Sequence, residues 1–368
     1  MPRLSDRFGL FPAYPLAHVP QRKRELLQRG VDVIDLGAGD ADLAPPPAAV
    51  AELQRAASVP SLGRYGFGLG HVPFREAIAA WMAKRFGTTV DPMSEVVPLL
   101  GSKEGLAHVA FAYLGRGDVA VIPEPAYQAY LGGTLLSDAT PHVYALRPRT
   151  NFLVELDEMP DDVASRTRVV YLNYPNNPTT AVAPRDYLAR LLALAEKHGF
   201  TLLSDECYSE IWRTAPPTGA LQVAAETGAD PERVAVFHSL SKRSNLPGLR
   251  SGFVAGDADV LAAFLQYRTY HGCALPGSTQ AASVAAWGDE AHVQANRALY
   301  RAKLDAVLDV LGPVLDVSRP EAGFFLWPRV PGDDERWAQQ LFAGQHVTVL
   351  PGRYLARDTA LGNPGAGR

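Results

Sequence analysis

A lysine and an arginine follow a short apolar run, together with two hydroxyl side chains. The run Val234–Phe237 precedes Ser239 and Ser241. Lys242 comes next, and Arg250 lies eight residues beyond it. Ligands of open α/β sheets gather at the carboxyl ends of the strands. A lysine at such a place can be desolvated and made nucleophilic, hydroxyls can donate to a phosphate, and a guanidinium can bind the same phosphate with its planar fork.

The distribution of lysines makes Lys242 stand out. A lysine in a surface loop is more often a solvated charge than a nucleophile. The chain has six lysines, and four of them fall in charged helical segments where a solvated face explains them, namely Lys23, Lys84, Lys197 and Lys303. Lys242 lacks that explanation, and a lysine beside phosphate-binding groups is what a pyridoxal phosphate (PLP) enzyme requires.

Side chains suited to the rest of PLP follow four other apolar runs, and they are Ser102 with Lys103, Tyr127, Asn177 and Asp205. Ser102 and Lys103 open a helix whose free N–H groups suit a phosphate. The Tyr127 ring can stack on a planar cofactor. Asp205 is expensive to bury without a cationic partner, which a protonated pyridine nitrogen supplies. Each feature also has an ordinary explanation, such as a helix start or a turn, but together they provide every part that PLP needs.

Composition excludes several other classes of partner. With 368 residues the chain exceeds the size at which one hydrophobic core stops growing, so two domains are expected. The formal net charge of −4 gives no electrostatic footprint for nucleic acid or an anionic membrane. No apolar run approaches a membrane span or a signal-peptide core. The two cysteines, Cys207 and Cys273, match no metal motif, so no metal is expected and both are interpreted as free thiols in a reducing cytoplasm.

The segment from Val96 to Gly256 alternates apolar runs with helical patterns, which is typical of a parallel sheet covered on both faces. This pattern predicts an α/β fold with seven strands, at 96–100, 119–122, 142–146, 169–173, 201–204, 234–237 and 252–255. Helices are predicted between them, at 104–113, 185–198 and 221–227.

Further helices are expected at 47–57, 74–85, 261–266 and 280–287. In the outer regions, helices at 21–29, 289–311 and 335–342 and strands at 31–36, 323–327 and 347–350 predict a second, smaller α+β domain. We therefore divide the chain into an N-terminal arm and part of the small domain at 1–45, a large PLP-binding domain at 46–285 and a C-terminal small domain at 286–368.

The stretch Tyr65–Gly70 contains three glycines that invite a dinucleotide-binding interpretation. Such a motif follows a strand, and the preceding residues Ser61–Arg64 do not read as one. The glycines are therefore expected to shape a loop that presents Tyr65.

The motifs above resemble those of the class I and II aminotransferases of PLP fold type I. The resemblance runs from about Asp35 to the end of the chain. It rests on Asn177-Pro178-Thr179, Asp205-Glu206-Cys207-Tyr208 and Ser239-Leu240-Ser241-Lys242 followed by Arg250. It implies a seven-stranded, mostly parallel sheet flanked by helices, with a smaller α+β domain.

The resemblance implies a role for each of these residues. Lys242 binds PLP covalently and moves a proton at the substrate's Cα atom. Asp205 keeps the pyridine nitrogen protonated, and Tyr127 stacks on the ring. Tyr208 and Asn177 bind the phenolic oxygen.

The resemblance also implies how the phosphate and the substrate are held. The phosphate is bound by Ser239, Arg250 and the backbone amides of Ser102 and Lys103. Tyr65 reaches in from a partner subunit, which makes a homodimer part of the implied active site. Substrate contacts are implied for Gly37, Asn177 and Tyr65.

Within the family, Gly101–His108 and Tyr267–Gly272 resemble the bacterial N-succinyl-LL-diaminopimelate aminotransferases of lysine biosynthesis. The segment Phe237–Lys242 is similar also to LL-diaminopimelate aminotransferase, which uses the unsuccinylated substrate. The favoured prediction is a ping-pong transfer of an amino group from glutamate to N-succinyl-2-amino-6-oxopimelate. The alternative is LL-diaminopimelate aminotransferase, or another amino-acid aminotransferase of the same fold.

One feature departs from the family pattern. The arginine that clamps the substrate's α-carboxylate follows a glycine-rich turn near the C-terminus, and Gly362–Arg368 resembles that turn. The best match puts that arginine about two residues past Arg368, where it would make a bidentate contact. The expectation is therefore a shortened small domain, or else that Arg368 takes the role.

Other classes have weaker support. Ser239–Lys242 fits the Ser-x-x-Lys pattern of β-lactamase-type enzymes, but the Ser-Asp-Asn and Lys-Thr-Gly tripeptides that accompany it do not occur. Other PLP chemistry on the same fold, such as that of a β-lyase, is an alternative. A PLP-binding domain of a regulator is another, although no basic DNA-binding segment precedes Asp35.

Overall fold

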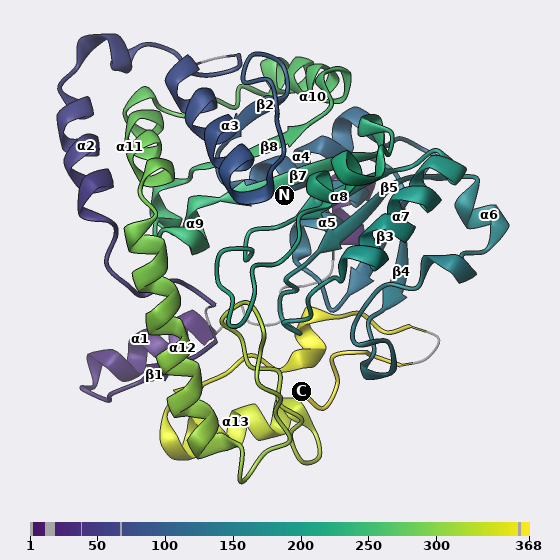
Figure 1. Ribbon diagram of the computed structural model, residues 1–368. Helices are drawn as coiled ribbons and strands as arrows, with labels where there is room; N and C mark the ends of the chain where they lie inside the picture. Colours follow the sequence, from purple (N-terminus) through teal and green to yellow (C-terminus); the bar gives the residue numbers. More distant parts are fainter. Residues whose placement is uncertain (1–2, 12–18, 38, 67, 360–361) are drawn as a thin grey trace.

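A central sheet of seven strands organises the protein (Figure 1). The computed structural model describes residues 3–11, 19–37, 39–66, 68–359 and 362–368. The strand order is β2-β8-β7-β6-β5-β3-β4, and only β8 runs antiparallel to its neighbours. The strands are β2 (Val96–Leu99), β3 (Val119–Glu124), β4 (Thr140–Ala145), β5 (Thr167–Asn173), β6 (Thr201–Asp205), β7 (Val234–Ser239) and β8 (Gly252–Gly256). The predicted α/β fold with a mostly parallel sheet is confirmed.

The two faces of the sheet are both apolar, as the central strand β7 shows. Its side chains alternate between two clusters of buried residues, because successive residues of a strand point to opposite faces. Val234 and Val236 pack in one cluster, and Ala235 and Phe237 pack in the other. The first cluster includes Phe74, Leu191 and Val223, whereas the second includes Leu106, Tyr130 and Phe264. Helices therefore cover both faces, which is what continuous apolar strands require.

The helices agree closely with the periodic patterns in the sequence. They are α1 (Val19–Gln28), α2 (Pro47–Ala57), α3 (Val72–Phe86), α4 (Ser102–Tyr113), α5 (Gln128–Leu136), α6 (Asp161–Ala164), α7 (Arg185–His198), α8 (Ala220–Thr227), α9 (Leu240–Arg243), α10 (Ala258–His271), α11 (Gly277–Gly288), α12 (Ala291–Leu311) and α13 (Asp334–Gln345). α10 and α11 are longer than predicted. Among the described residues, no helix has the length and apolar character needed to cross a bilayer.

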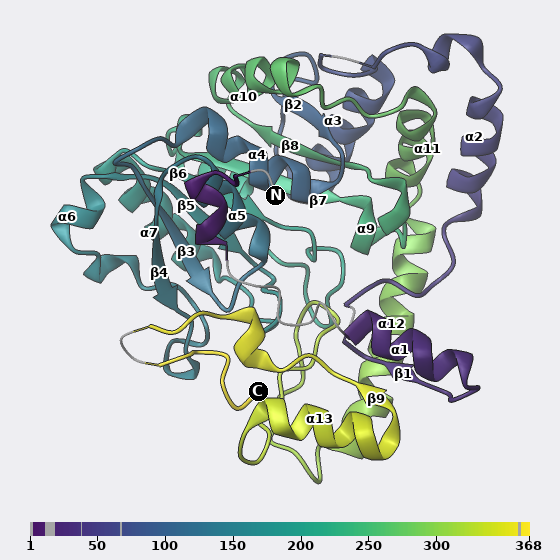
Figure 2. The same cartoon turned by 180° about the vertical axis from the view of Figure 1, so that it is seen from behind.

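A small second sheet joins segments from the two outer parts of the chain. β1 (Ile34–Asp35) pairs in parallel with β9 (Val347–Thr348), and both lie near α1 and α13 in the lower part of the two views (Figures 1 and 2). The long helix α12 runs from the central sheet down to this region. The domain boundaries at residues 45 and 285 stay a prediction.

All three strands predicted outside the central sheet differ in the structure, and the one expected at 347–350 shortens to β9. The prediction of a strand at 323–327 is wrong, because these residues form no strand. The rings of Phe324 and Phe325 instead both pack against Tyr208, with centroids 5.6 and 5.4 Å from its ring. The strand expected at 31–36 shortens to β1, whose Ile34 is 52% exposed, so it lacks the packing that would extend it.

The short helix α9, which carries Lys242, is anchored by a buried cation. Arg243 is 2% exposed, and its guanidinium pairs with Glu290 and donates to the Ala286 carbonyl at 2.8 Å. The ring centroids of Trp287 and Trp81 lie 4.8 and 5.6 Å from the guanidinium carbon. This arrangement ties α9 to α11 and fixes the backbone on which Lys242 sits.

Replacing Arg243 by methionine is expected to lower the free energy of unfolding by about 3 kcal/mol, because it leaves Glu290 and two carbonyls without their donor. Urea unfolding followed by tryptophan fluorescence measures the change. The control is Arg116→Met, which breaks an ion pair to Asp138 in which the arginine side chain is 89% exposed. That variant should change stability little, and equal effects of the two substitutions would refute the anchoring role.

Candidate active site

Three neighbouring strands bring the predicted residues to one edge of the sheet. The register pairs Asn173 of β5 with Asp205 of β6, and Asp205 with Phe237 of β7. The side-chain amide of Asn173 donates to the backbone carbonyl of Asp205 at 2.9 Å, which holds the two strand ends together. The loop after β5 carries Asn177, and α9 directly follows β7. The carboxyl ends of the strands thus collect the groups that the sequence singled out.

Asp205 is a buried acid without a counter-ion among the described residues. It is 5% exposed and forms no ion pair with any lysine, arginine or histidine that the structure describes. Its carboxylate accepts hydrogen bonds from the Tyr130 hydroxyl at 2.8 Å and the Cys207 amide at 3.2 Å. Burial raises the pKa of Asp205, and these two donors oppose the rise. A cation placed beside this carboxylate would therefore be strongly favoured.

Lys242 presents its amine on the same edge of the sheet. Ser239 begins α9 as a cap, with its hydroxyl accepting from the Ser241 amide at 3.0 Å. The Lys242 Nζ atom donates to the Gly39 carbonyl at 2.6 Å and lies 5.2 Å from the centre of the Phe324 ring. Burial lowers the pKa of Lys242, although Asp40 and Cys207 act in the opposite direction. A lowered pKa increases the fraction of neutral, nucleophilic amine.

Tyr208 and Asn177 form a pair of hydrogen-bond donors. The Asn177 amide donates to the Tyr208 hydroxyl at 3.4 Å, and the Tyr208 side chain is buried against Phe324 and Phe325. Burial raises the pKa of Tyr208 well above its usual range, and the negative charge of Asp205 adds to the effect. The Tyr208 hydroxyl therefore keeps its proton at neutral pH and remains able to donate.

The backbone of β8 passes close to the start of α4, and we call this place the cradle. Gly252 is paired in register with Ser239, and a Cβ atom at Gly252 would lie 2.6 Å from the His238 carbonyl and 3.0 Å from the Ser102 amide nitrogen. The absence of a side chain lets β8 approach the first turn of α4, whose amides begin at Ser102. Free amides at a helix start attract anions.

Arg250 approaches the same turn of the backbone. Its guanidinium donates to the Leu100 carbonyl at 3.0 Å and the Pro247 carbonyl at 2.7 Å. Gly101 has φ of +75° and no side chain, and a Cβ atom there would collide with the Arg250 guanidinium. Arg250 therefore lies beside the backbone that leads into the Ser102 amide, while Ser239 is paired in register with Gly252 on the other side of the cradle.

Tyr127 and Lys103 lie beside this group. Tyr127 directly precedes α5, and burial raises its pKa to about 12, with the nearby Asp205 charge as the next cause. The Lys103 Nζ atom lies 5.5 Å from the centre of the Tyr127 ring. The Lys103 side chain is exposed, so only its backbone amide belongs to the buried start of α4.

The positions of Tyr65, Gly37 and Arg368 do not test the roles predicted for them, so these roles stay predictions. Tyr65 is 88% exposed. Gly37 packs against Thr348 of β9 and against the backbone of Val349, which follows β9. The Arg368 guanidinium donates to the Trp327 carbonyl at 3.0 Å.

The structure adds residues that the sequence did not single out for the site. Tyr130 donates to Asp205 although 75 positions separate them. Tyr130 lies in the first turn of α5, which begins directly after Tyr127, and nothing in the local sequence pattern pointed to its contact with Asp205. Phe324, Phe325 and the Gly39 carbonyl join from the outer segments, where no sequence pattern pointed to them.

The described residues fit PLP group by group. PLP has a ring nitrogen that can carry a proton, a phenolic oxygen, a reactive aldehyde and a phosphate. The buried Asp205 lacks a cation, Tyr208 and Asn177 offer hydrogen-bond donors, and Lys242 offers an amine of lowered pKa. The cradle around Gly252 offers amides, a hydroxyl and a guanidinium to an anion.

Comparisons with known proteins agree with this fit. The family model for aminotransferases of class I and II matches residues 31–368. The LL-diaminopimelate aminotransferase of Aquifex aeolicus is 35% identical over 352 residues, which cover 93% of this chain and 88% of that protein. The enzyme of the same name from Syntrophobacter fumaroxidans is 35% identical over 370 residues, covering 99% and 92% of the two chains.

Solved structures give the same result for the fold. A crystal structure of an aminotransferase from Neisseria meningitidis superposes with a TM-score of 0.91 at 40% identity, covering 99% of this chain and 94% of the other. A probable N-succinyldiaminopimelate aminotransferase from Thermus thermophilus superposes with a TM-score of 0.87 at 32% identity, covering 95% and 92%.

Replacing Gly252 by alanine is expected to weaken PLP binding by about tenfold, because the added methyl group must push β8 away from the Ser102 amide and remove a hydrogen bond from the cradle. A spectroscopic titration of cofactor-free protein with PLP measures the dissociation constant. Gly248→Ala is the matched control, since a Cβ atom at Gly248 meets nothing within 4 Å. A Gly252→Ala variant that binds PLP as tightly as the control would contradict the cradle.

Proposed function

This chain is a member of the class I and II aminotransferase family, and from that premise we propose that its substrate is a diaminopimelate, with LL-diaminopimelate as the first candidate. The chain is thus a PLP-dependent aminotransferase, which exchanges amino groups between amino acids and 2-oxo acids. The aminotransferase chemistry is supported by Lys242, an amine of lowered pKa, and by Asp205, a buried acid without a counter-ion among the described residues. The observation that carries the substrate proposal is the similarity to relatives named LL-diaminopimelate aminotransferase.

We assign the cofactor contacts to the residues that face the strand ends. Asp205 would pair with the ring nitrogen, and Lys242 would bind the cofactor covalently. Tyr208 and Asn177 would donate to the phenolic oxygen. The first turn of α4, Ser239 and Arg250 would hold the phosphate, and Tyr127 would contact the ring.

The chemistry follows from how these side chains hold protons. Bound PLP supplies an electron sink for the pair of electrons left when the substrate's Cα–H bond breaks. The neutral Lys242 amine would take the proton from Cα and deliver it to the cofactor's former aldehyde carbon, and the second half-reaction would run this transfer in reverse. Burial raises the pKa of Asp205, so a positive charge beside the carboxylate stabilises its ionised form, and Asp205 thereby favours a protonated ring nitrogen. Tyr208 keeps its hydroxyl proton and continues to donate throughout.

The names of the relatives favour the unsuccinylated substrate over the one that the sequence motifs favoured. Relatives named LL-diaminopimelate aminotransferase are 35% identical over 93% and 99% of this chain. The succinylated substrate is the second candidate, because the probable N-succinyldiaminopimelate aminotransferase of Thermus thermophilus shares the fold at 32% identity. The two substrates differ strongly in chemistry, since succinylation replaces an ammonium group by an amide and adds a carboxylate.

We also propose that the enzyme acts as a homodimer in the cytoplasm. Tyr65 is 88% exposed on this chain, which is the condition for a ring that enters the active site of a second copy. Both cysteines are free thiols, which fits a reducing compartment.

The substrate proposal predicts a clear preference between two donors. With PLP-loaded protein and 2-oxoglutarate, kcat/KM for LL-diaminopimelate should exceed that for N-succinyl-LL-diaminopimelate by at least about tenfold, because a pocket suited to an ammonium group leaves an extra carboxylate unpaired. Coupled measurement of glutamate formation gives both values. The opposite preference would establish the second candidate, and activity with neither would refute a diaminopimelate substrate.

Asp205→Asn is expected to lower kcat by about 10²–10³-fold, because it removes the charge that stabilises a protonated ring nitrogen. The matched control is Asp138→Asn at an exposed position. Single-turnover rates with glutamate separate this effect from substrate binding.

The same variant should leave the cofactor-free protein nearly as stable as wild type. Burial raises the pKa of Asp205 in the folded state, so the ionised carboxylate weakens folding at neutral pH and its favourable contribution appears only at lower pH. Asparagine carries no charge to bury, but it also loses one of the hydrogen bonds that the carboxylate accepts. The free energy of unfolding should therefore change by no more than about 1.5 kcal/mol. A large loss of stability with no loss of rate would assign Asp205 a structural role instead.

A further inference from the structure

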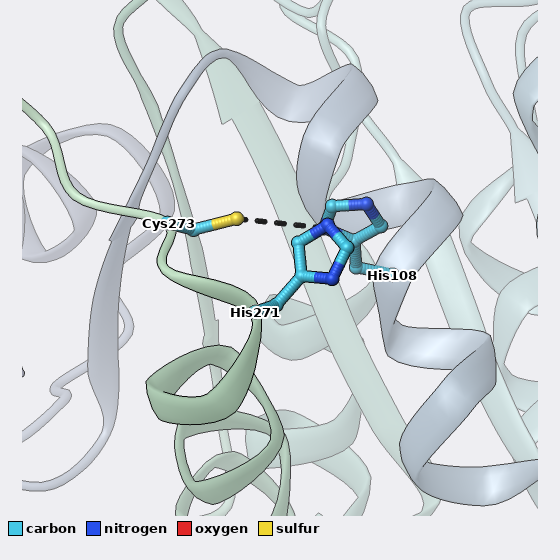
Figure 3. A group of neighbouring side chains, drawn as sticks. All are labelled: His108, His271 and Cys273. Atoms are coloured by element: carbon cyan, nitrogen blue, oxygen red, sulfur yellow. Dashed lines mark hydrogen bonds between the residues drawn. The ribbon is translucent and has the colours of Figure 1, made fainter.

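Two histidines and a cysteine converge at a point that the proposed reaction does not use (Figure 3). His108 lies on α4, His271 is the last residue of α10, and Cys273 follows two residues later. One ligand atom from each side chain lies within 4.8 Å of the other two. The fold brings these residues together across a separation of 165 positions, which is why linear spacing predicted no metal motif.

The distances are close to those of a tetrahedral metal ion. Zn–S and Zn–N bonds of about 2.3 and 2.05 Å at the tetrahedral angle separate the two ligand atoms by roughly 3.6 Å. The Cys273 Sγ atom lies 3.7 Å from the His108 Nδ1 atom. His271 is exposed, so its ring can move the further ångström or so that the third bond requires.

From this geometry we propose that His108, His271 and Cys273 form a binding site for a divalent transition metal ion, foremost Zn²⁺. Thiolate and imidazole are the ligands that zinc prefers, and three protein ligands leave a fourth position for water. As the S–Zn bond forms, the Cys273 thiol gives up its proton to solvent, and both histidines bind as neutral rings.

One neighbouring group supports a ligand, and two others set the local charge. The Glu104 carboxylate lies 3.3 Å from the His108 Nδ1 atom, the same nitrogen that faces Cys273, so metal binding would replace this contact; Arg268 holds the carboxylate at 3.0 Å. The Tyr267 hydroxyl lies 3.1 Å from the His271 Nδ1 atom. Groups that hydrogen-bond to metal ligands orient them. Arg268 opposes a cation here, but its charge is paired with Glu104, so the net charge of the two neighbours is zero.

A hydrogen bond between thiol and imidazole would explain part of the cluster but not all of it. Such a bond accounts for Cys273 and His108. The His271 ring packs edge-on against the His108 ring, with centroids 4.3 Å apart, and stacks on Tyr267, so a zinc titration decides between a packed cluster and a metal site. Zinc binds the thiolate, so formation of the S–Zn bond should displace the Cys273 thiol proton.

Metal binding would also connect two elements of the fold. α4 begins at Ser102 in the phosphate cradle and carries His108 farther along, while His271 and Cys273 lie at the end of α10. An ion that binds only the folded protein raises its unfolding temperature. The site should thus be detectable by stability as well as by binding.

The test uses tag-free protein loaded with PLP and freed of metal by dialysis against a chelator. Zn²⁺ is titrated in competition with a chromophoric chelator, and zinc K-edge X-ray absorption reports the ligands. We expect one ion per chain, one sulfur ligand, a proton released on binding and a higher unfolding temperature. Cys273→Ser and the exposed His271→Gln should each weaken binding by at least about tenfold, since a direct ligand contributes no less than a supporting group.

The other cysteine of the chain supplies the control. Cys207→Ser removes a thiol beside Asp205 and should leave zinc affinity unchanged, because Cys207 lies outside the cluster. Lack of saturable zinc binding, an ion without a sulfur ligand, or equal affinity in the Cys273→Ser and Cys207→Ser variants would each overturn the proposal.

Discussion

Burial of ionisable groups at the carboxyl edge of the sheet is the constraint on which the site depends. Asp205 has its pKa raised and Lys242 has its pKa lowered, and burial is the first cause in both cases. Neither shift favours the charged form that each group has in water. The folded chain therefore holds an acid that needs a cation and an amine that readily gives up its proton. A cofactor with a basic ring nitrogen and a reactive aldehyde satisfies both groups together.

Backbone geometry matters as much as side-chain chemistry in building this site. Parallel pairing aligns the ends of β5, β6 and β7, which no single segment could do alone. Gly252 allows β8 to approach the first turn of α4, and Gly101 leaves room for the Arg250 guanidinium. Buried Arg243 then fixes the helix that carries Lys242. Rigid elements of this kind hold reacting groups in place before substrate arrives.

The sequence predicted those parts of the fold and site that have local causes. The seven strands and α7 follow from apolar runs and helical periodicity, and Asp205 and Ser239 stand at strand ends. The apolar run at 323–327 led to a wrong strand prediction, because the ring of Phe324 packs on Tyr208 and the segment does not join a sheet. The Tyr130–Asp205 contact and the convergence of His108 with Cys273 depend on packing between distant segments, so local patterns could not predict them.

The most direct test of the account is to locate the lysine that carries the cofactor. Protein loaded with PLP is reduced with borohydride, digested and mapped by mass spectrometry. The account predicts that the label lies on Lys242 alone among the six lysines of the chain, and that Lys242→Ala protein carries none while still binding PLP without a covalent bond. A label on another lysine, or its persistence in the Lys242→Ala variant, would contradict the central claim.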